Sequence, residues 1–300
     1  MRIQELQSQF AIPGAVEFEP GQGGLTRMAI TTSECAAHIY THGAHVTHWQ
    51  RHGEAPVLFM SSQSQFKDGA PIRGGVPVCF PWFGGSGPAG APIHGVARLA
   101  EWEVESVTLK SDGTVVAVFL LNANERALAP WPQRFELRHR VTVGRSLTMA
   151  LEARNTDPKP QRITEALHTY FLVDDVRQIR VLGLENASYI DTAGGGRVER
   201  RQGAEPITIT AETDRVYLNN RATCVIEVPN FGRKIVIEKS GSDSTVVWNP
   251  WIAKAKAMPD FGDDEWPRMI CVETANAHGN AITLAPGASH VMEARIRLET

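Results

Sequence analysis

The sequence lacks long apolar runs and a strong excess of charge of either sign. No stretch approaches the roughly 18 consecutive apolar residues of a membrane-spanning helix, and the first ten residues lack the apolar core of a signal peptide. We therefore expect a cytoplasmic protein that does not engage a membrane. The formal net charge of -3 does not favour nucleic acid as a partner. Any anionic ligand would have to be held by local arginines.

Cysteine is scarce, and its spacing fits neither a metal site nor a disulfide framework. The four cysteines are far apart in the chain, in apolar or strand-like runs, and no Cys-x-x-Cys pair occurs. Such residues are typical of reduced thiols in the core of a cytoplasmic protein. They are Cys35, Cys79, Cys224 and Cys271.

Helical periodicity is also rare, whereas short strand-like runs follow one another along the chain. Only residues 2–10 have the three- and four-residue apolar spacing of an amphipathic helix. Elsewhere, runs separated by Gly, Pro and Asp-Gly turns predict antiparallel strands and hairpins, and so an all-β sandwich or barrel. The predicted strands are 28–32, 36–40, 44–49 and 57–60, and the predicted hairpins pair 102–109 with 114–121, 135–143 with 147–155, 225–228 with 234–239, and 281–284 with 290–298.

No linker divides the chain, so we expect a single domain over residues 1–300. The glycine-rich segments 84–90 and 193–196 are short enough to be loop tips. The first of them lacks the Gly-Lys-Ser/Thr ending of a nucleotide-binding loop, which argues against a nucleotide cofactor. We expect a monomer or a weak homo-oligomer.

Two groups of polar residues could suggest a metal site, but neither has the right geometry. His42, His45, His48 and His52 belong to a strand-like segment, where side chains alternate between two faces. We expect ordinary strand histidines there, some of them at the rim of a pocket. The segment Gly-Asp-Asp-Glu at 262–265 lacks the further oxygen ligands of a calcium loop and is expected to be a solvated loop.

Residues 71–98 combine prolines, aromatic residues and glycines with very few polar side chains. Arg73, His94 and Arg98 are the ones best able to reach a ligand. A planar guanidinium offers paired donors, so the two arginines suit an anionic group. On these residues alone, the alternative that both arginines lie on the surface beside a proline-rich loop stays open.

Two apolar runs each carry one ionisable side chain. His168 lies within Glu-Ala-Leu-His-Thr-Tyr-Phe, and Glu273 lies within Met-Ile-Cys-Val-Glu-Thr-Ala-Asn. The residues alone are equally compatible with a satisfied core histidine and a surface glutamate at a strand end. Asp214, in Thr-Asp-Arg-Val-Tyr, is a third candidate, whose alternative is a salt-bridged turn residue beside Arg215.

These motifs together resemble the aldose 1-epimerase (mutarotase) family. The resemblance rests on Arg-Gly-Gly-Val-Pro-Val-Cys-Phe-Pro-Trp-Phe-Gly at 73–84, on His-Gly-Val-Ala-Arg at 94–98, and on the runs around positions 168, 214 and 273. Within the family, the sequence is similar to the glucose-6-phosphate 1-epimerase branch. The resemblance implies a large antiparallel β supersandwich with few short helices, and a cofactor-independent isomerase.

The resemblance also implies catalytic roles for the two candidates in apolar runs. His168 becomes the general acid and Glu273 the general base of sugar-ring opening and reclosure. An imidazole near its usual pKa of about 6.5 can give and retake a proton at neutral pH. We expect burial to raise the pKa of Glu273 and a nearby imidazolium to lower it, so that the carboxylate stays ionised near neutral pH.

The remaining motif residues are expected to bind a small-molecule sugar phosphate. By resemblance, Asp214 binds sugar hydroxyls, Arg73 and Arg98 hold the phosphate at C6, and His94 is a further substrate-binding residue. The tryptophans of residues 246–251 are predicted to serve mainly in packing. A mutarotase for unphosphorylated aldoses and a non-catalytic carbohydrate-binding protein remain the alternatives.

Overall fold

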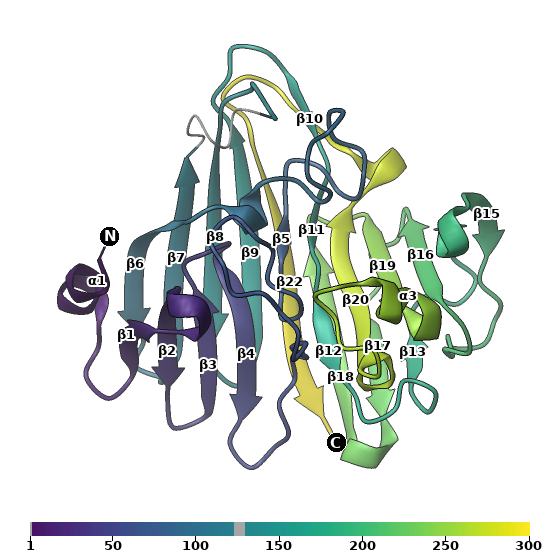
Figure 1. Ribbon diagram of the computed structural model, residues 1–300, viewed down its shortest axis with the longest axis horizontal. Helices are drawn as coiled ribbons and strands as arrows, with labels where there is room; N and C mark the ends of the chain where they lie inside the picture. Colours follow the sequence, from purple (N-terminus) through teal and green to yellow (C-terminus); the bar gives the residue numbers. More distant parts are fainter. Residues whose placement is uncertain (1, 123–129) are drawn as a thin grey trace.

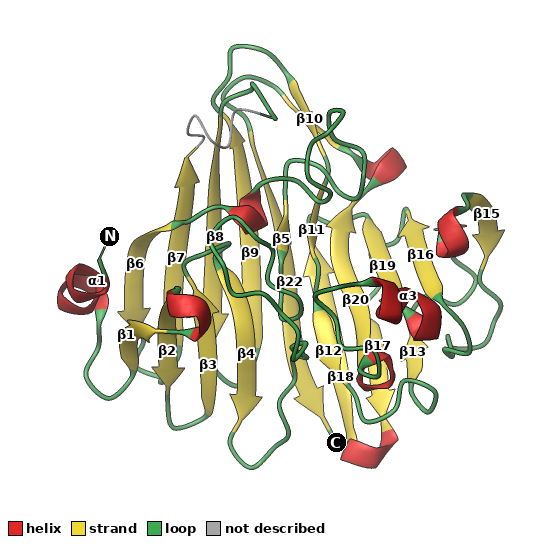
Figure 2. Ribbon diagram, in the orientation of Figure 1, coloured by secondary structure: helices red, strands yellow, loops and turns green. Residues whose placement is uncertain are grey.

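The computed structural model describes residues 2–122 and 130–300 and consists mainly of antiparallel strands (Figures 1 and 2). Within these ranges the α-helices are α1 (Ile3–Phe10) and α3 (Trp251–Ala257). Helix α1 confirms the helix predicted from apolar spacing. Leu6 is buried, and Ile3 and Phe10 pack against the core beside it.

One layer of the fold is a single eight-stranded antiparallel sheet. Its inward side chains alternate with partly exposed ones, as the two-residue period of a strand requires. In spatial order its strands are β13 (Arg180–Leu182), β17 (Cys224–Val228), β18 (Arg233–Ser240), β22 (Ser289–Glu299), β9 (Leu147–Asn155), β8 (Phe135–Val143), β7 (Val115–Asn122) and β6 (Glu103–Leu109).

The facing layer contains two sheets, which lie in front of the first layer in Figure 1. An isolated bridge between Val46 and Val76 connects them. The first sheet has the order β1 (Val16–Pro20), β2 (Thr26–Thr31), β3 (Cys35–Tyr40) and β4 (His45–Arg51). The second has the order β15 (Val198–Arg201), β14 (Ser188–Asp191), β16 (Thr213–Leu218), β19 (Ser244–Asn249), β20 (Met269–Asn276), β11 (Glu165–Leu167) and β5 (Val78–Cys79), and β12 (Tyr170–Leu172) also pairs with β20.

The main hydrophobic core fills the space between the two layers. Its buried members run along the chain from Leu6 to Ile296 and come from both layers. The all-β supersandwich predicted from the sequence is thus confirmed. The single domain over residues 1–300 stays a prediction, with which this continuous core agrees.

Three of the four predicted hairpins form, and the fourth does not. Strand β6 pairs with β7, β8 with β9, and β17 with β18. The hairpin of 281–284 with 290–298 is wrong, because β21 (Ile282–Leu284) pairs with β10 (Gln161–Ile163) while β22 pairs with β9 and β18. Gly287 N–H donates to Asn155 O, and the Asn155 amide donates to Leu284 O. The turn at Pro286-Gly287 is therefore tied to β9.

The strand predicted at 57–60 is also wrong. This segment forms isolated bridges only, from Leu58 to Phe171 and from Met60 to Gly74. Phe59 N–H donates to Tyr170 O, while its own carbonyl accepts from Gly75 N–H. The segment is extended, but its successive hydrogen bonds go to different partners, so no ladder develops.

The histidines at 42–52 do not form a metal site or line the cavity described below. Three of them bond through Nε2 to separate backbone carbonyls, and the ring of His48 lies 5.0 Å from that of His38. Within the described ranges, no three-ligand group contains any of the four. His45 and His48 lie on β4 as predicted, whereas His42 precedes it and His52 follows it, and the expected place of these histidines at the pocket rim is wrong. The bonded pairs are His42–Ala70, His45–Gly74 and His52–Thr32.

All four cysteines are buried and free. Among the described helices, none is long and apolar enough to cross a membrane.

Candidate active site

Strand register brings distant segments together on one face of the second front sheet. Asp214 on β16 pairs with Trp248 on β19, and Trp248 pairs with Cys271 on β20. A second row lies two residues further along these strands, where Val216 pairs with Val246 and Val246 pairs with Glu273. Because side chains two residues apart point to the same face, these two rows form one surface.

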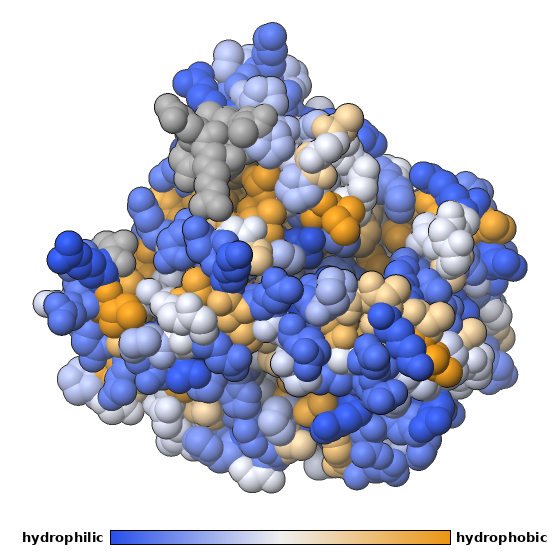
Figure 3. All heavy atoms as spheres, in the orientation of Figure 1, coloured by the Kyte–Doolittle hydropathy of each residue, from blue (hydrophilic) through white to orange (hydrophobic). Residues whose placement is uncertain are grey.

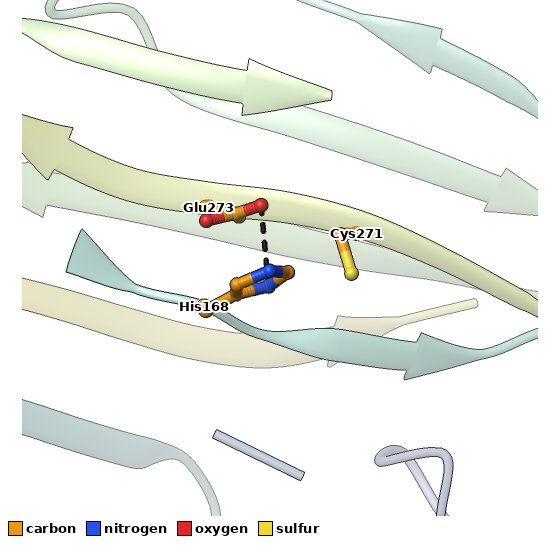
Figure 4. A group of neighbouring side chains, drawn as sticks. All are labelled: His168, Cys271 and Glu273. Carbon is orange, nitrogen blue, oxygen red and sulfur yellow. Dashed lines mark ion pairs between the residues drawn. The ribbon is translucent and has the colours of Figure 1, made fainter. Parts of the chain in front are cut away.

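His168 stands opposite Glu273 across this surface. Leu167 pairs with Thr274, and Tyr170 pairs with Cys271. The same register places His168, which follows Leu167, opposite Glu273. His168 Nδ1 lies 3.2 Å from Glu273 Oε1. Figure 4 shows the two side chains pointing toward one another, Glu273 from β20 and His168 from the segment between β11 and β12.

Aromatic rings fix the position of the imidazole. The ring of Tyr170 stacks on His168 at 4.8 Å with an interplanar angle of 12°. The indole of Trp248 meets His168 edge-on at 6.0 Å. His168 is only 6% exposed and Glu273 only 1% exposed, so the pair is held in a poorly hydrated place.

Burial dominates the protonation of the pair. It lowers the pKa of His168 well below 6.5, and the charges of Arg98 and Arg73 lower that pKa further. Burial raises the pKa of Glu273 well above 4.5, as does the charge of Asp214, whereas Arg98 opposes the rise. Desolvation thus opposes the ionised Glu273 expected from the sequence more strongly than the positive charge of Arg98 favours it, and the ionised state stays a prediction.

A loop crossing places His94 at the edge of the same site. Gly95 has a φ of +77°, and a Cβ there would lie 2.0 Å from the Phe80 carbonyl oxygen, so only glycine permits this approach. The ring of His94 then lies 5.3 Å from that of His168. Gly84 N–H donates to His94 Nδ1, which leaves Nε2 of the neutral ring as the donor. Burial lowers the pKa of His94 well below 6.5.

Arg73 lies beside the pair and uses only part of its N–H donors for bonds within the protein. Its Nε and Nη2 donate to Asp260 Oδ2 at 3.1 and 3.0 Å, and its Nη1 donates to the Tyr170 hydroxyl at 2.9 Å. A guanidinium has five N–H donors. Arg73 therefore keeps donors that a ligand can use.

Arg98 is close to these residues but does not line the cavity. Its side chain is 5% exposed, and its Nη2 donates to Ile93 O. Its charge affects the pKa values of His94, His168 and Glu273. In this arrangement Arg98 acts on the site through its electric field, and its predicted contact with phosphate stays a prediction.

Asp214 lies across the cavity, on a strand rather than in the turn that its alternative assumed. Lys254 Nζ of α3 lies 3.7 Å from Asp214 Oδ2 and 3.0 Å from Glu212 Oε1. Burial raises the pKa of Asp214, and the Lys254 charge counteracts this. A carboxylate held this way can accept hydrogen bonds from two neighbouring hydroxyl groups.

These side chains line one cavity of about 620 Å³, a volume within the usual range for small-molecule sites. Figure 3 shows the hollow near the middle of this face, with hydrophobic side chains gathered around it. Of the predicted site residues, all except Arg98 line the cavity. Among the lining residues that were not predicted as site residues are three basic side chains and one tryptophan: Arg197, Lys254, His278 and Trp248.

Only Trp248 among these four had a local signal. It lies in the motif at 246–251, where the tryptophans were predicted to serve mainly in packing, yet Trp248 forms part of the cavity wall. Arg197 lies in the loop before β15, His278 begins a short 3-10 helix (His278–Asn280) after β20, and Lys254 lies on α3. Nothing in their local sequence indicates which loops surround the cavity.

The β supersandwich, with an imidazole and a carboxyl group facing one another in an open cavity, fits an isomerase that acts on a sugar. The model of the family Aldose 1-epimerase matches residues 27–297. The chain belongs to this family, which confirms the resemblance found in the sequence and the prediction of an isomerase.

Several relatives cover most of the chain. A protein of Cenchrus ciliaris named "Putative glucose-6-phosphate 1-epimerase" is 38% identical over 292 residues, covering 94% of this chain and 86% of the relative. One of the same name from Escherichia coli (strain K12) is 37% identical, with 78% of each chain covered. A crystal structure of a protein described as "a putative mutarotase (YeaD) from Salmonella typhimurium" has a TM-score of 0.90 at 30% identity, covering 97% of this chain and 96% of that chain.

Proposed function

We propose that this protein interconverts the α and β anomers of hexose 6-phosphates, with glucose 6-phosphate as the preferred substrate. The observation that carries the proposal is the opposed pair of His168 and Glu273, 3.2 Å apart at the floor of an open cavity. The names of the relatives support the choice of substrate. Cytoplasmic location and oligomeric state stay predictions.

The reaction requires one proton to leave the anomeric hydroxyl and another to reach the ring oxygen. The reactive form of the pair is a Glu273 carboxylate and a His168 imidazolium, whose nearest atoms, Oε1 and Nδ1, lie 3.2 Å apart. Glu273 then takes the hydroxyl proton while His168 protonates the ring oxygen, and the bond from C1 to the ring oxygen breaks. Rotation about the C1–C2 bond and reclosure with reversed roles give the other anomer.

Binding groups surround this pair on two sides. Asp214 on β16 accepts hydrogen bonds from the sugar hydroxyl groups. The Nε2–H of His94 donates a hydrogen bond to the substrate from the loop on the other side. Arg73 uses its remaining N–H groups for the phosphate, and Arg98 adds positive potential from below. Arg197, at the cavity wall, has no hydrogen bond or ion pair among the described residues and offers a further cation.

Polarimetry with freshly dissolved α-glucose 6-phosphate and α-galactose tests the proposal. We expect the protein to accelerate mutarotation of the phosphorylated sugar far more than that of galactose. Faster mutarotation of galactose would assign the protein to the unphosphorylated aldoses. NMR exchange measurements on His168→Asn address the non-catalytic alternative, because unchanged exchange with an intact fold would indicate a binding protein.

A further inference from the structure

The side chain of Cys271 lies next to the catalytic pair, and ring opening does not use it. Cys271 and Glu273 are two residues apart on β20 and point to the same face, toward the segment that carries His168. One ligand atom from each of the three residues lies within 4.8 Å of the other two. Figure 4 shows the sulfur, the imidazole and the carboxylate gathered between the two strands.

This set of donors suits a thiophilic divalent cation. Zinc binds nitrogen and oxygen at about 2.0–2.2 Å and sulfur at about 2.3 Å, in tetrahedral geometry. Ligand atoms around such an ion are therefore separated by roughly 3.3–3.8 Å. The separations here, up to 4.8 Å, require only small side-chain movements. A fourth position would open toward the cavity, which His168 and Glu273 line.

The polar atoms of the pair also lack other partners. His168 Nδ1 and Glu273 Oε2 are buried and have no hydrogen-bond partner among the described residues. The 3.2 Å contact between Nδ1 and Oε1 does not have the geometry of a hydrogen bond, although it is close enough for an ion pair. A cation bound between these atoms and Cys271 Sγ would give both buried polar groups the partner that they lack.

We propose that His168, Cys271 and Glu273 form a binding site for Zn²⁺ and similar thiophilic divalent cations such as Cd²⁺. The bound cation occupies the lone pairs that proton transfer needs and therefore inhibits the enzyme in competition with the substrate. The inhibition rests on the proposed epimerase function, whereas the binding does not. Removal of the cation by a chelator restores the acid–base pair.

Direct binding is tested with Cd²⁺, because cadmium–thiolate bonding gives an ultraviolet charge-transfer absorption. Titration of the full-length protein should produce this absorption with one equivalent of Cd²⁺. Cys271→Ala should abolish it. The matched variant Cys224→Ala should retain it, because Cys224 is equally buried but lies on β17 in the other layer. No absorption in the wild type, or equal absorption in a folded Cys271→Ala variant, would overturn the site.

Inhibition is tested by anomer exchange in the presence of Zn²⁺, followed by addition of EDTA. Loss of a supporting partner costs roughly 10–100-fold in metal affinity, and loss of a ligand should cost at least as much. Cys271→Ala should therefore keep its basal exchange rate and need at least about 10-fold more Zn²⁺ for inhibition. Equal sensitivity of the variant would refute the site. Lack of exchange activity in the wild type would refute the epimerase function, while the Cd²⁺ titration would still decide on the metal site.

Discussion

Replacement of Glu273 by glutamine tests the catalytic pair most directly. The amide keeps the shape of the carboxyl group but cannot carry the transferred proton. Proton transfer by one positioned group contributes roughly 10²–10⁴ in rate. At 1.36 kcal/mol per tenfold change, this corresponds to about 2.7–5.4 kcal/mol of activation free energy. We expect kcat for glucose 6-phosphate to fall by about 10²–10⁴ in Glu273→Gln, measured by NMR exchange above the uncatalysed rate.

The separation of the two groups predicts how a second substitution acts. His168 Nδ1 and Glu273 Oε1 are 3.2 Å apart, and the proposed ring opening needs both residues in one step, so we expect them to work as a unit. Residues that act as a unit have strongly non-additive effects. The double variant His168→Asn/Glu273→Gln should therefore be about as slow as each single variant, rather than slower by the product of both losses.

A buried glutamate outside the cavity provides the matched control. Glu165 is fully buried on β11 and accepts a hydrogen bond from the Asn276 amide. Glu165→Gln should keep exchange within a few-fold of the wild type. Thermal unfolding should confirm that all variants are folded. A Glu273→Gln variant with more than about a tenth of the wild-type rate would refute the proposed role of the carboxylate.

Three further variants test binding and the electric field of the site. Arg73→Met should weaken glucose 6-phosphate by about 10- to 150-fold, from the 1.5–3 kcal/mol of a charge-assisted hydrogen bond, and leave free glucose almost unchanged. The double variant Arg73→Met/Asp260→Asn is the control, because Arg73→Met alone leaves the Asp260 carboxylate without its partner. Equal losses of affinity for both sugars would contradict phosphate binding by Arg73. Activity requires one proton on the catalytic pair, and Arg98 lowers the pKa of both its groups. Arg98→Met should therefore move both limbs of the pH–rate profile to higher pH, while Arg98→Lys should not, and an unmoved profile would exclude the field effect. Asp214→Asn should raise KM for phosphorylated and free sugar alike by about 10-fold, the loss of one charge-assisted bond, while Asp191→Asn outside the cavity leaves KM unchanged.

The fold could be predicted from the sequence where the signals are local. The Asp-Gly turn before Val115 and the two-residue alternation of β8 and β9 depend only on neighbouring residues, and these hairpins form. The hairpin expected at Pro286-Gly287 failed because a turn signal does not determine strand partners. Strand β22 gains more by pairing along its length with β9 and β18 than with the three residues of β21.

The candidate site could be predicted only in part for the same reason. Motifs resembling the family indicated His168 and Glu273, but their opposition depends on the pairing of β20 with β11 and β12. No local pattern indicates a register between segments about a hundred positions apart. The loop position of Arg197 and the burial of Arg98 likewise depend on tertiary packing. Such packing involves residues from the whole core and cannot be predicted from the local sequence.

The division of the site between strands and loops separates rate from specificity. In the proposed catalytic pair, Glu273 lies on β20 and His168 lies between β11 and β12, stacked against Tyr170, so that strand pairing fixes their separation of 3.2 Å. Arg73 and His94 lie in loops held against the sheet by close backbone contacts at Gly75 and Gly95. Loop changes can therefore alter which sugar is bound without moving the pair. Substitutions in the strands should instead reduce the rate for every sugar, whatever group it carries at C6.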